Sequence, residues 1–375
     1  MRPDLESTPK LGFGCMRLPL LDPADQQSID LAQLEQMVDV FLEGGGTYFD
    51  TAFVYHEGAS EKALGQALVA RHPRESFTIA TKCLAWAIGS AEEAKSNLGT
   101  SLERLGTDYI DFYLLHNVGG PRTAKFDEHG MWDFVREQKA AGRIRNWGFS
   151  MHDGPEALDA LLEAHPDADF VQLQVNYLDW ENPVTRSRAC MEAAAKHGVP
   201  VVVMEPARGG RLAELPEQVA APLLACRPDL SMASWAYRFC YNLPNVLTVL
   251  SGMSTIEQTR QNVAEFRASA PFSPEEERAL AEAREMLEKL AAVPCTNCRY
   301  CVKDCPQGVV IPTILGLLNL ELMTENRDFA KGLYSWQAAP GPASSCIACG
   351  ACEAMCPQGI DIVRQLEVAA EHFEG

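Results

Sequence analysis

Positive charge is what this sequence has least of. Its 375 residues include 32 Lys and Arg against 51 Asp and Glu, which gives a formal net charge of −19. A surface with this balance repels the phosphates of nucleic acid, so we expect no nucleic-acid partner. The acidic balance suits a soluble protein, or one that meets a basic partner.

Long apolar runs are also missing. No stretch is long and apolar enough to span a bilayer, and the opening segment MRPDLESTPK lacks the apolar region of a signal peptide. Five cysteines show no pairing pattern, which is typical of a reducing compartment. They are Cys15, Cys83, Cys190, Cys226 and Cys240. We therefore expect a cytoplasmic protein with no membrane partner.

A glycine fingerprint of the form G-x-G-x-x-G does not follow any early strand, which disfavours a doubly wound sheet. Instead, short apolar segments of the kind found in buried parallel strands alternate with helical patterns. The eight predicted strands are Leu11–Cys15, Thr47–Thr51, Thr78–Lys82, Tyr109–His116, Ile144–Ser150, Phe170–Val175, Pro200–Met204 and Val246–Ser251. Eight strands with helices between them predict a (β/α)8 TIM barrel.

Helical patterns fill the gaps between these strands. Ser28 is the predicted N-cap of the first helix, which Gly44–Gly46 should end. The other predicted helices are Glu61–Ala70, Ala91–Leu105, Met131–Ala141, Pro155–Glu163, Pro183–His197, Ser231–Arg238 and Thr255–Arg267. Beyond them, Ser273–Glu276 has the pattern of a capping box, which predicts the start of a charged helix over Pro274–Ala291.

Cysteine is concentrated near the C-terminus, in two copies of one spacing. Both copies follow C-x₂-C-x₂-C-x₃-C-P, a run that is typical of [4Fe–4S] binding. They are Cys295, Cys298, Cys301 and Cys305 before Pro306, and Cys346, Cys349, Cys352 and Cys356 before Pro357. A disulfide scaffold suits short secreted chains, and zinc favours two close pairs with a longer gap between them. The sequence therefore predicts two [4Fe–4S] clusters.

The repeated run also predicts how the clusters share their ligands, because in two-cluster ferredoxins the fourth cysteine of each run ligates the other cluster. One cluster should be held by Cys295, Cys298, Cys301 and Cys356, and the other by Cys346, Cys349, Cys352 and Cys305. The spacer Ile311–Gln337 is apolar and helix-like. We therefore predict a barrel over residues 1–292 and a small, mostly α-helical ferredoxin-like domain over 293–375.

Four polar residues close or follow three successive predicted strands: Asp50, Tyr55, Lys82 and His116. Barrel enzymes place their catalytic groups at these strand ends. The Lys82 ammonium would stabilise the Tyr55 phenolate and lower its pKa, while Asp50 would hold Lys82 in place. His116 would donate a hydrogen bond to a carbonyl oxygen as charge develops there. Such a set is suited to general acid–base catalysis.

The motifs around these residues resemble the aldo-keto reductase family, in its iron–sulfur-bearing branch. The resemblance runs from Leu11 to about Phe266, through LGFGCMRLP, DTAFVYHEGASEKALG, ATKC, DFYLLHN, GFSMH and the QN of 261–262. It implies that Asp50, Tyr55, Lys82 and His116 form a catalytic tetrad. It also implies that NADP or NAD exchanges hydride with a small-molecule carbonyl or alcohol, and that Tyr55 protonates the carbonyl oxygen.

The resemblance implies a cofactor site as well. Ser150 and Gln172 match carboxamide-binding residues, but Met151 replaces the family's Asn, with His152 as a substitute. Met204 stands at the nicotinamide-stacking position, where a thioether can pack on the ring. The other implied contacts are Gly209 and Gly210 at the pyrophosphate, and Ser254, Gln258, Gln261 and Asn262 toward the adenosine end.

Two arginines follow predicted strands: Arg17 comes after the first and Arg208 after the seventh. Arg is suited to bidentate binding of carboxylates. Our hypothesis is that one of them holds an anionic substrate. A structural salt bridge would explain either residue equally well.

Two functions remain open at this point. The first is an NAD(P)-dependent oxidoreductase of aldo-keto reductase type, whose clusters relay electrons or dock a ferredoxin-like redox partner. The second is an electron-transfer or docking module on a barrel that has lost or altered its nicotinamide chemistry. Hydride transfer moves two electrons together and each cluster moves one, while no flavin motif that could bridge the two steps is evident.

Overall fold

A computed structural model of the chain describes residues 5, 7–23, 25–182, 185–268, 270–290, 293, 295, 300–303, 305–324, 326–356 and 359–375. The chain folds into two compact units. The first comprises residues 1–213 and 230–272, and the second comprises residues 214–229 and 273–375. The predicted domain boundary at 292/293 stays a prediction.

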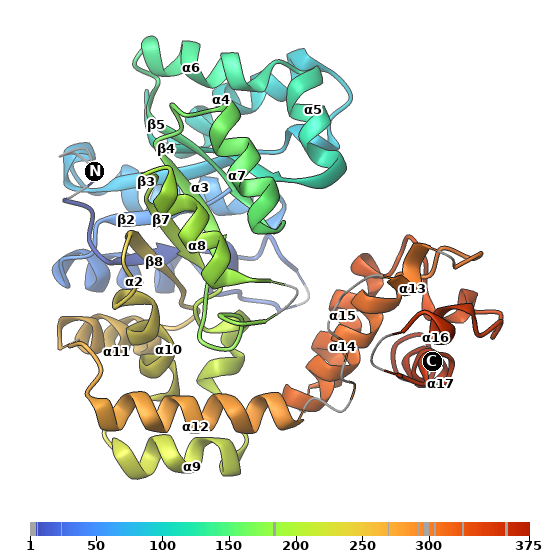
Figure 1. The fold of residues 1–375 in the computed structure, drawn as a ribbon. Coiled ribbons are helices and arrows are strands. Elements are labelled where there is room, and N and C mark those ends of the chain that lie inside the picture. The colour runs from blue at the N-terminus through green and yellow to red at the C-terminus, as the bar shows by residue number, and fades with distance from the viewer. Residues whose placement is uncertain are drawn as a thin grey trace. The chain divides into compact units, whose positions relative to one another are not determined.

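The first unit is built on a closed barrel of eight parallel strands in sequential order (Figure 1). The strands are β1 (Leu11–Gly14), β2 (Tyr48–Asp50), β3 (Thr78–Cys83), β4 (Ile110–Val118), β5 (Ile144–Met151), β6 (Phe170–Gln174), β7 (Val201–Met204) and β8 (Val246–Gly252). Parallel pairing of β1 with β8 closes the barrel. The predicted TIM barrel is therefore confirmed, and each predicted strand is present with ends shifted by only one or two residues.

Nine α-helices are assigned in the described part of this unit. They are α2 (Leu31–Glu43), α3 (Ala59–Leu64), α4 (Ala91–Leu105), α5 (Thr123–Glu128), α6 (Met131–Ala140), α7 (Pro155–Ala164), α8 (Ser187–Lys196), α10 (Met232–Tyr241) and α11 (Ile256–Arg267). The sequence did not predict α5. The predicted start of α8, Pro183, lies outside the described residues.

The predicted cap of α2 was wrong. Asp30 is the N-cap, and its carboxylate accepts the Gln33 N–H at 3.0 Å. An antiparallel bridge between Leu20 and Ile29 keeps the chain extended up to this residue. Ser28 lies within that loop, where its hydroxyl contacts the backbone of the loop itself.

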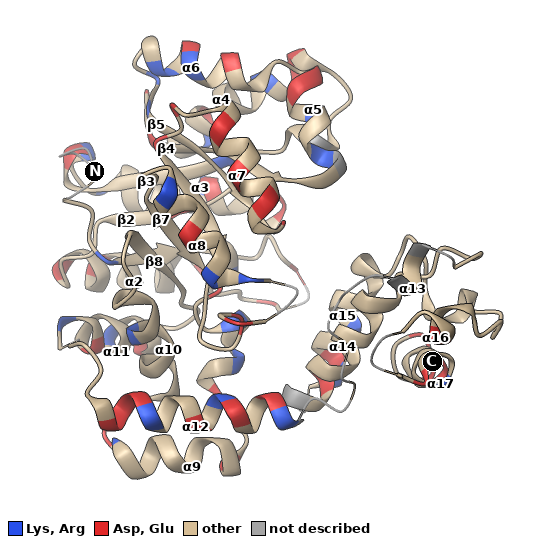
Figure 2. Cartoon of the chain, viewed as in Figure 1, with Lys and Arg blue, Asp and Glu red and all other residues tan. Residues whose placement is uncertain are grey.

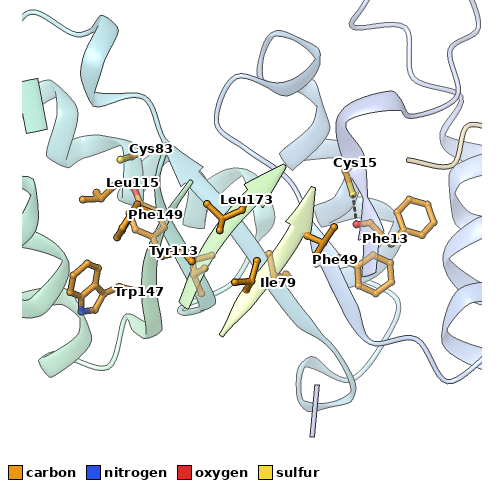
Figure 3. Close-up of a cluster of buried hydrophobic side chains, with 14 of the residues drawn as sticks. Phe13, Cys15, Phe49, Ile79, Cys83, Tyr113, Leu115, Trp147, Phe149 and Leu173 are labelled. Atoms are coloured by element: carbon orange, nitrogen blue, oxygen red, sulfur yellow. Dashed lines mark hydrogen bonds between the residues drawn. The ribbon is translucent and has the colours of Figure 1, made fainter. Parts of the chain in front are cut away.

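Side chains alternate between the two faces of each strand. Outward-facing residues, among them Phe13, Phe49 and Tyr113, form a large apolar cluster with the surrounding helices (Figure 3). A second cluster fills the barrel interior with Tyr48, Ala80, Phe112, Leu114, Phe170, Val202 and Leu250. Two residues further along these strands, the same inward positions are taken by Asp50, Lys82, His116, Gln172 and Met204. Alternation thus places these predicted site residues in one layer at the C-terminal end of the barrel.

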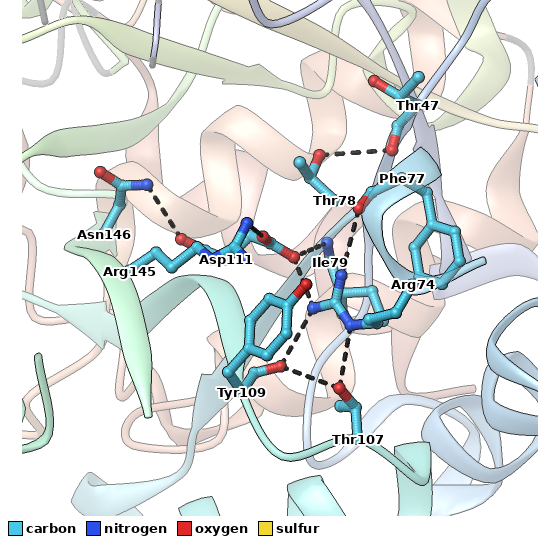
Figure 4. Close-up of polar contacts among 10 residues, drawn as sticks. All are labelled: Thr47, Arg74, Phe77, Thr78, Ile79, Thr107, Tyr109, Asp111, Arg145 and Asn146. Atoms are coloured by element: carbon cyan, nitrogen blue, oxygen red, sulfur yellow. Dashed lines mark hydrogen bonds and ion pairs between the residues drawn. The ribbon is translucent and has the colours of Figure 1, made fainter. Parts of the chain in front are cut away.

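A polar cluster around Asp111 lies at the N-terminal end of the barrel and connects neighbouring strands there (Figure 4). Asp111 is only 2% exposed. It accepts hydrogen bonds from Arg74 at 2.6 Å and from the Ile79 N–H and Arg145 at 3.0 Å each. Both guanidinium groups also lie over the Tyr109 ring, 3.9 and 4.0 Å from its centroid. One buried carboxylate therefore links the beginnings of β3, β4 and β5.

In the described residues of the second unit, the regular secondary structure is helical. Its helices are α9 (Glu217–Cys226), α12 (Pro274–Leu290), α13 (Tyr300–Lys303), α14 (Ile311–Thr324), α15 (Arg327–Gln337), α16 (Ala351–Ala354) and α17 (Ile362–Phe373). α9, which the sequence did not predict, lies beside α12 (Figure 1). The predicted helical character of the spacer Ile311–Gln337 is confirmed, since α14 and α15 occupy it.

The capping box at the start of α12 is also confirmed. Glu276 accepts the Ser273 N–H at 2.8 Å, and the Ser273 hydroxyl accepts the Glu276 N–H at 3.2 Å. Figure 2 shows acidic and basic residues interspersed along this helix. In the part of the chain that the structure describes, no helix is long and apolar enough to cross a membrane.

We predict that Asp111→Asn lowers the free energy of unfolding by about 3 kcal/mol, because it leaves two arginines without their buried counter-charge. Urea unfolding of the purified variant measures this change. Glu128→Gln is the matched control, since Glu128 forms an exposed pair with Lys125 and should have little effect. Equal stability of the two variants would contradict the structural role of Asp111.

Candidate active site

A buried ion pair between Lys82 and Asp50 lies at the centre of the polar layer. The Lys82 ammonium donates to Asp50 Oδ1 and to the Thr51 carbonyl, each at 2.6 Å. The two charged side chains are 1% and 3% exposed. Burial lowers the pKa of Lys82, but the charge of Asp50 and the neighbouring Tyr55 outweigh burial, so the pKa is raised overall. The ammonium therefore keeps its proton.

Tyr55 lies directly over this ammonium, 4.8 Å from Lys82 Nζ to the ring centroid. Burial raises the pKa of its phenol, and the lowering effect of the Lys82 charge is smaller, so the net shift is upward. The predicted lowering of the Tyr55 pKa by Lys82 is present, and the effect of burial outweighs it. The phenol is consequently held in its protonated form.

A sharp turn after β2 positions Tyr55. His56 and Glu57 have positive φ angles of 51° and 54°, which few residues other than glycine adopt. The His56 ring accepts the Leu18 N–H at 3.1 Å through Nε2. Its Nδ1 can then donate to the Gln26 carbonyl at 3.0 Å. Contacts with a separate loop thus maintain the turn, and the local sequence gave no sign of them.

His116 completes the group on the β4 side. Its ring centroid is 6.2 Å from that of Tyr55, and the two rings are nearly perpendicular. Burial, followed by the charge of Lys82, lowers the pKa of His116 to about 3. Its buried Nδ1 has no hydrogen-bond partner among the described residues. The structure therefore brings the four predicted tetrad residues together, with a neutral imidazole and a neutral phenol beside a charged ammonium.

A second buried carboxylate, that of Glu61, contacts the strand that carries Lys82. Glu61 is fully buried, accepts the Thr81 hydroxyl at 2.7 Å and pairs with Arg104 at 3.0 Å. Arg104 also donates to the Phe53 carbonyl at 3.0 Å. This network ties α3 and α4 to the strand that carries Lys82. Sequence reasoning missed it because its members are far apart in the chain.

The three residues implied for the nicotinamide lie on neighbouring strands. Ser150 pairs in register with Gln172, and Met204 lies one strand further, on β7. Ser150 and Gln172 are each 2% exposed. Met151, in contrast, belongs to the outer apolar cluster, while His152 is exposed and shares a hydrogen bond with Gln174.

The residues implied for the rest of the cofactor lie outside the barrel interior. Gly209 and Gly210 form a turn after β7 with φ angles of 70° and 97°. Ser254 donates to the Arg17 carbonyl at 2.7 Å, and its N–H donates to Gln258 Oε1 at 2.8 Å. Gln261 and Asn262 lie on α11, with their amides donating to Glu265 at 3.1 Å and to Ser251 at 2.9 Å.

The two arginines of the substrate hypothesis both form ion pairs. Arg17 pairs with Glu205 at 3.7 Å, and Arg208 pairs with the fully buried Asp179 at 3.4 Å. Arg211, which the sequence did not single out, lies in the same turn as Arg208. Burial and the neighbouring Arg208 charge lower its pKa to about 10. Anion binding by Arg17 or Arg208 stays a hypothesis.

The second unit contains a hollow lined by four cysteines. They are Cys305 from the first run and Cys346, Cys349 and Cys352 from the second. Backbone N–H groups of Val309 and Ala348 donate to the sulfurs of Cys305 and Cys346, each at 3.4 Å.

Of the four other cysteines in the two runs, the structure describes three. Cys301 and Cys352 are buried in the apolar cluster of this unit, with Cys295 and Cys356 packed against it. Cys298 lies outside the described residues. Within the described residues, no three His, Cys, Asp or Glu side chains converge to hold a single metal ion.

Comparison with known proteins identifies the barrel. Residues 10–285 match the sequence model of the Aldo/keto reductase family. The chain belongs to this family. Residues 294–360 match a second model, that of a 4Fe-4S dicluster domain. The predicted combination of an aldo-keto reductase barrel with a ferredoxin-type domain is thereby confirmed.

Individual relatives agree with this assignment. The uncharacterized oxidoreductase YqkF of Bacillus subtilis is 27% identical over 284 residues, covering 68% of this chain and 86% of YqkF. The methylglyoxal reductase YeaE of Escherichia coli is 33% identical over 147 residues, covering 39% of this chain and 47% of YeaE.

Solved structures of aldo-keto reductases are also similar. The holo form of AKR11C1 from Bacillus halodurans has a TM-score of 0.57 at 28% identity, covering 73% of this chain and 91% of its own. An aldo-keto reductase from Klebsiella pneumoniae in complex with NADPH has a TM-score of 0.57 at 25% identity, covering 73% and 90%. This aldo/keto reductase is therefore an oxidoreductase by family, with an iron–sulfur domain after its barrel.

We predict that His116 makes stability depend on pH below neutrality. Its folded pKa of about 3 lies below the unfolded value of 6.5, so between these values the unfolded chain binds more protons. The contribution of His116 to stability is fully present above pH 6.5 and falls as the pH drops. We expect the free energy of unfolding, measured with urea between pH 7 and 5, to change less steeply with pH in His116→Gln than in the unmodified protein. The difference in slope corresponds to up to about one proton. Identical slopes would contradict the neutral buried imidazole.

Proposed function

We propose that this aldo/keto reductase reduces a small-molecule carbonyl, or oxidises the corresponding alcohol, with NADPH or NADH. The observation that carries the proposal is the neutral Tyr55 phenol held over the charged Lys82. A bound nicotinamide would supply the hydride that the carbonyl carbon receives. Tyr55 gives its proton to the carbonyl oxygen, so the carbonyl becomes an alcohol. The similarity to the methylglyoxal reductase of Escherichia coli supports a carbonyl substrate.

The neighbouring charges fit this proton transfer. As the phenol gives up its proton, the resulting phenolate is stabilised by the Lys82 ammonium, which Asp50 holds in place. His116, neutral at physiological pH, can donate a hydrogen bond to the carbonyl oxygen while negative charge develops on it. Each residue of the tetrad therefore has a separate electrostatic role.

The residues around the tetrad fit a nicotinamide. The Gln172 side-chain oxygen is buried without a partner among the described residues, and an amide donor would satisfy it. Ser150 would bind the same carboxamide, and Met204 would pack on the ring. Gly209 and Gly210 allow close backbone approach to a pyrophosphate.

The adenosine end leaves the choice of nucleotide open. Ser254, Gln258, Gln261 and Asn262 are the residues that would hold it. The family resemblance implies Lys and Arg at positions that are Gly252 and Gln258 here. The proposal therefore covers both NADP and NAD.

We further propose that the second unit holds two [4Fe–4S] clusters with exchanged fourth ligands. The hollow that combines Cys305 with three cysteines of the second run supports one ligand set. Cys295, Cys298, Cys301 and Cys356 would form the other set. When bound, such clusters supply one-electron transfer. They would relay electrons to, or dock, a ferredoxin-like redox partner.

A second function is favoured by one observation. Met151 packs in the outer apolar cluster, so the amide that the family resemblance implies at this position is absent. The chain would then be an electron-transfer or docking module whose barrel has altered nicotinamide chemistry. The two functions differ in whether the barrel binds a nicotinamide and exchanges electrons with the clusters.

Tyr55→Phe should abolish carbonyl reduction, because the proton donor is lost, while cofactor affinity stays unchanged. Steady-state turnover with small carbonyl compounds and separate binding measurements would check both parts. Tyr241→Phe is the matched control, since Tyr241 packs on Phe266 on the outer side of the barrel with centroids 5.0 Å apart. Retained turnover in Tyr55→Phe would overturn the assignment.

The exchanged ligands predict an unusual result for double variants. Cys305→Ala with Cys349→Ala removes two ligands of one cluster, so iron analysis should give about four irons per chain instead of about eight. Cys301→Ala with Cys349→Ala removes one ligand from each cluster and should leave almost none. If each run held its own cluster, both double variants would lose all their iron.

Anaerobic titration with NADPH and with NADH should bleach the visible absorption of the clusters if the barrel passes electrons to them. Nucleotide binding without bleaching would instead indicate clusters with a structural or docking role. Absence of binding by either nucleotide would favour the second function.

A further inference from the structure

We infer that Asn117 completes the carboxamide site, in place of the amide that is missing at Met151. This inference rests on the nicotinamide binding proposed above. It concerns a residue that directly follows His116 at the end of β4.

The backbone of Asn117 is fixed on both sides. Its N–H donates to the Ser150 hydroxyl oxygen at 2.9 Å, and its carbonyl accepts from Arg122 Nε at 2.7 Å. Its φ angle is 59°, a left-handed conformation that Asn tolerates better than most residues. Such backbone strain is concentrated at binding sites. Asn117 is therefore held beside Ser150 in a defined orientation.

Two residues that neighbour Ser150 carry buried side-chain oxygens that lack donors. They are Asn117 and Gln172, and neither side-chain oxygen has a hydrogen-bond partner among the described residues. Because Ser150 pairs in register with Gln172 and bonds to Asn117, the three side chains come from the adjacent strands β4, β5 and β6. Buried acceptors of this kind are normally satisfied, so the pair marks a place where a ligand supplies the donors.

The unmet hydrogen bonds match a primary carboxamide. Asn117 and Gln172 offer two acceptors, and Ser150, whose oxygen already accepts the Asn117 N–H, still has its own proton to donate. A carboxamide presents two N–H donors and one carbonyl acceptor. Its groups therefore match the three unmet hydrogen bonds in number and type, while those of a carboxylate, which has no N–H, do not.

The two other candidates for the missing amide are placed differently. Met151 is 1% exposed and packs in the outer apolar cluster, on the face of β5 opposite to Ser150. His152 is exposed, and its ring is hydrogen-bonded to Gln174. Asn117 remains, with a backbone N–H bonded to Ser150 and a buried side-chain oxygen without a partner among the described residues.

The test compares Asn117→Gly with a matched control. Glycine readily adopts positive φ, so the substitution removes the amide and leaves the backbone contacts of residue 117 in place. Asn245→Gly makes the same change at a φ of 63°, one residue before β8. Calorimetry on the cluster-loaded proteins measures the affinity for NADP⁺ and NAD⁺. It also measures the affinity for 2′-phospho-ADP-ribose and ADP-ribose, two fragments that lack the nicotinamide.

Asn117→Gly should weaken dinucleotide binding about five-fold, the loss of one hydrogen bond, and leave the two fragments unaffected. Asn117→Asp, which keeps an acceptor oxygen, should recover part of the affinity, and Asn245→Gly should match the unmodified protein. Unchanged dinucleotide affinity in Asn117→Gly, or equal weakening of dinucleotide and fragment, would overturn the role of Asn117 alone. An unmodified protein that binds neither dinucleotide would overturn the proposed function as well.

Discussion

Closure of the barrel through parallel pairing of β1 with β8 determines where the polar groups that the strands carry to the candidate site lie. Because all strands run in one direction, their C-terminal ends meet at a single rim. Because side chains alternate, one inward position on each strand falls in the same layer. Asp50, Lys82 and Gln172 therefore meet although they are far apart in sequence. The apolar layer beneath them, which includes Tyr48 and Phe112, excludes water and strengthens the interaction of the buried charges.

Burial then decides the protonation of the site. It raises the pKa of Tyr55 and lowers the pKa of His116, so both rings are uncharged hydrogen-bond donors. Lys82 and Asp50 keep their charges because each compensates the other in a buried ion pair. The result is a buried ion pair beside two neutral donors, an arrangement suited to negative charge that appears only during a reaction.

The strands, most helices and the tetrad were predictable because they depend on local periodicity and on the position of polar residues at strand ends. The failures have specific causes. Helix α9 contains Pro222, which disfavours helix in sequence reasoning, and α5 has a single buried residue, Phe126. The true cap of α2, Asp30, depends on a bridge between Leu20 and Ile29. Asn117 and the Glu61 network become apparent only from partners that the fold brings together.

The path of the chain between its two units has a consequence for modularity. The segment 214–229, which contains α9, belongs to the second unit although it lies between β7 and β8 in sequence. The chain thus passes from one unit to the other at 213/214, 229/230 and 272/273. No single cut can separate the units cleanly. The second unit is therefore interleaved with the barrel sequence, and a gene fusion or truncation at one junction would divide a packed unit of the protein.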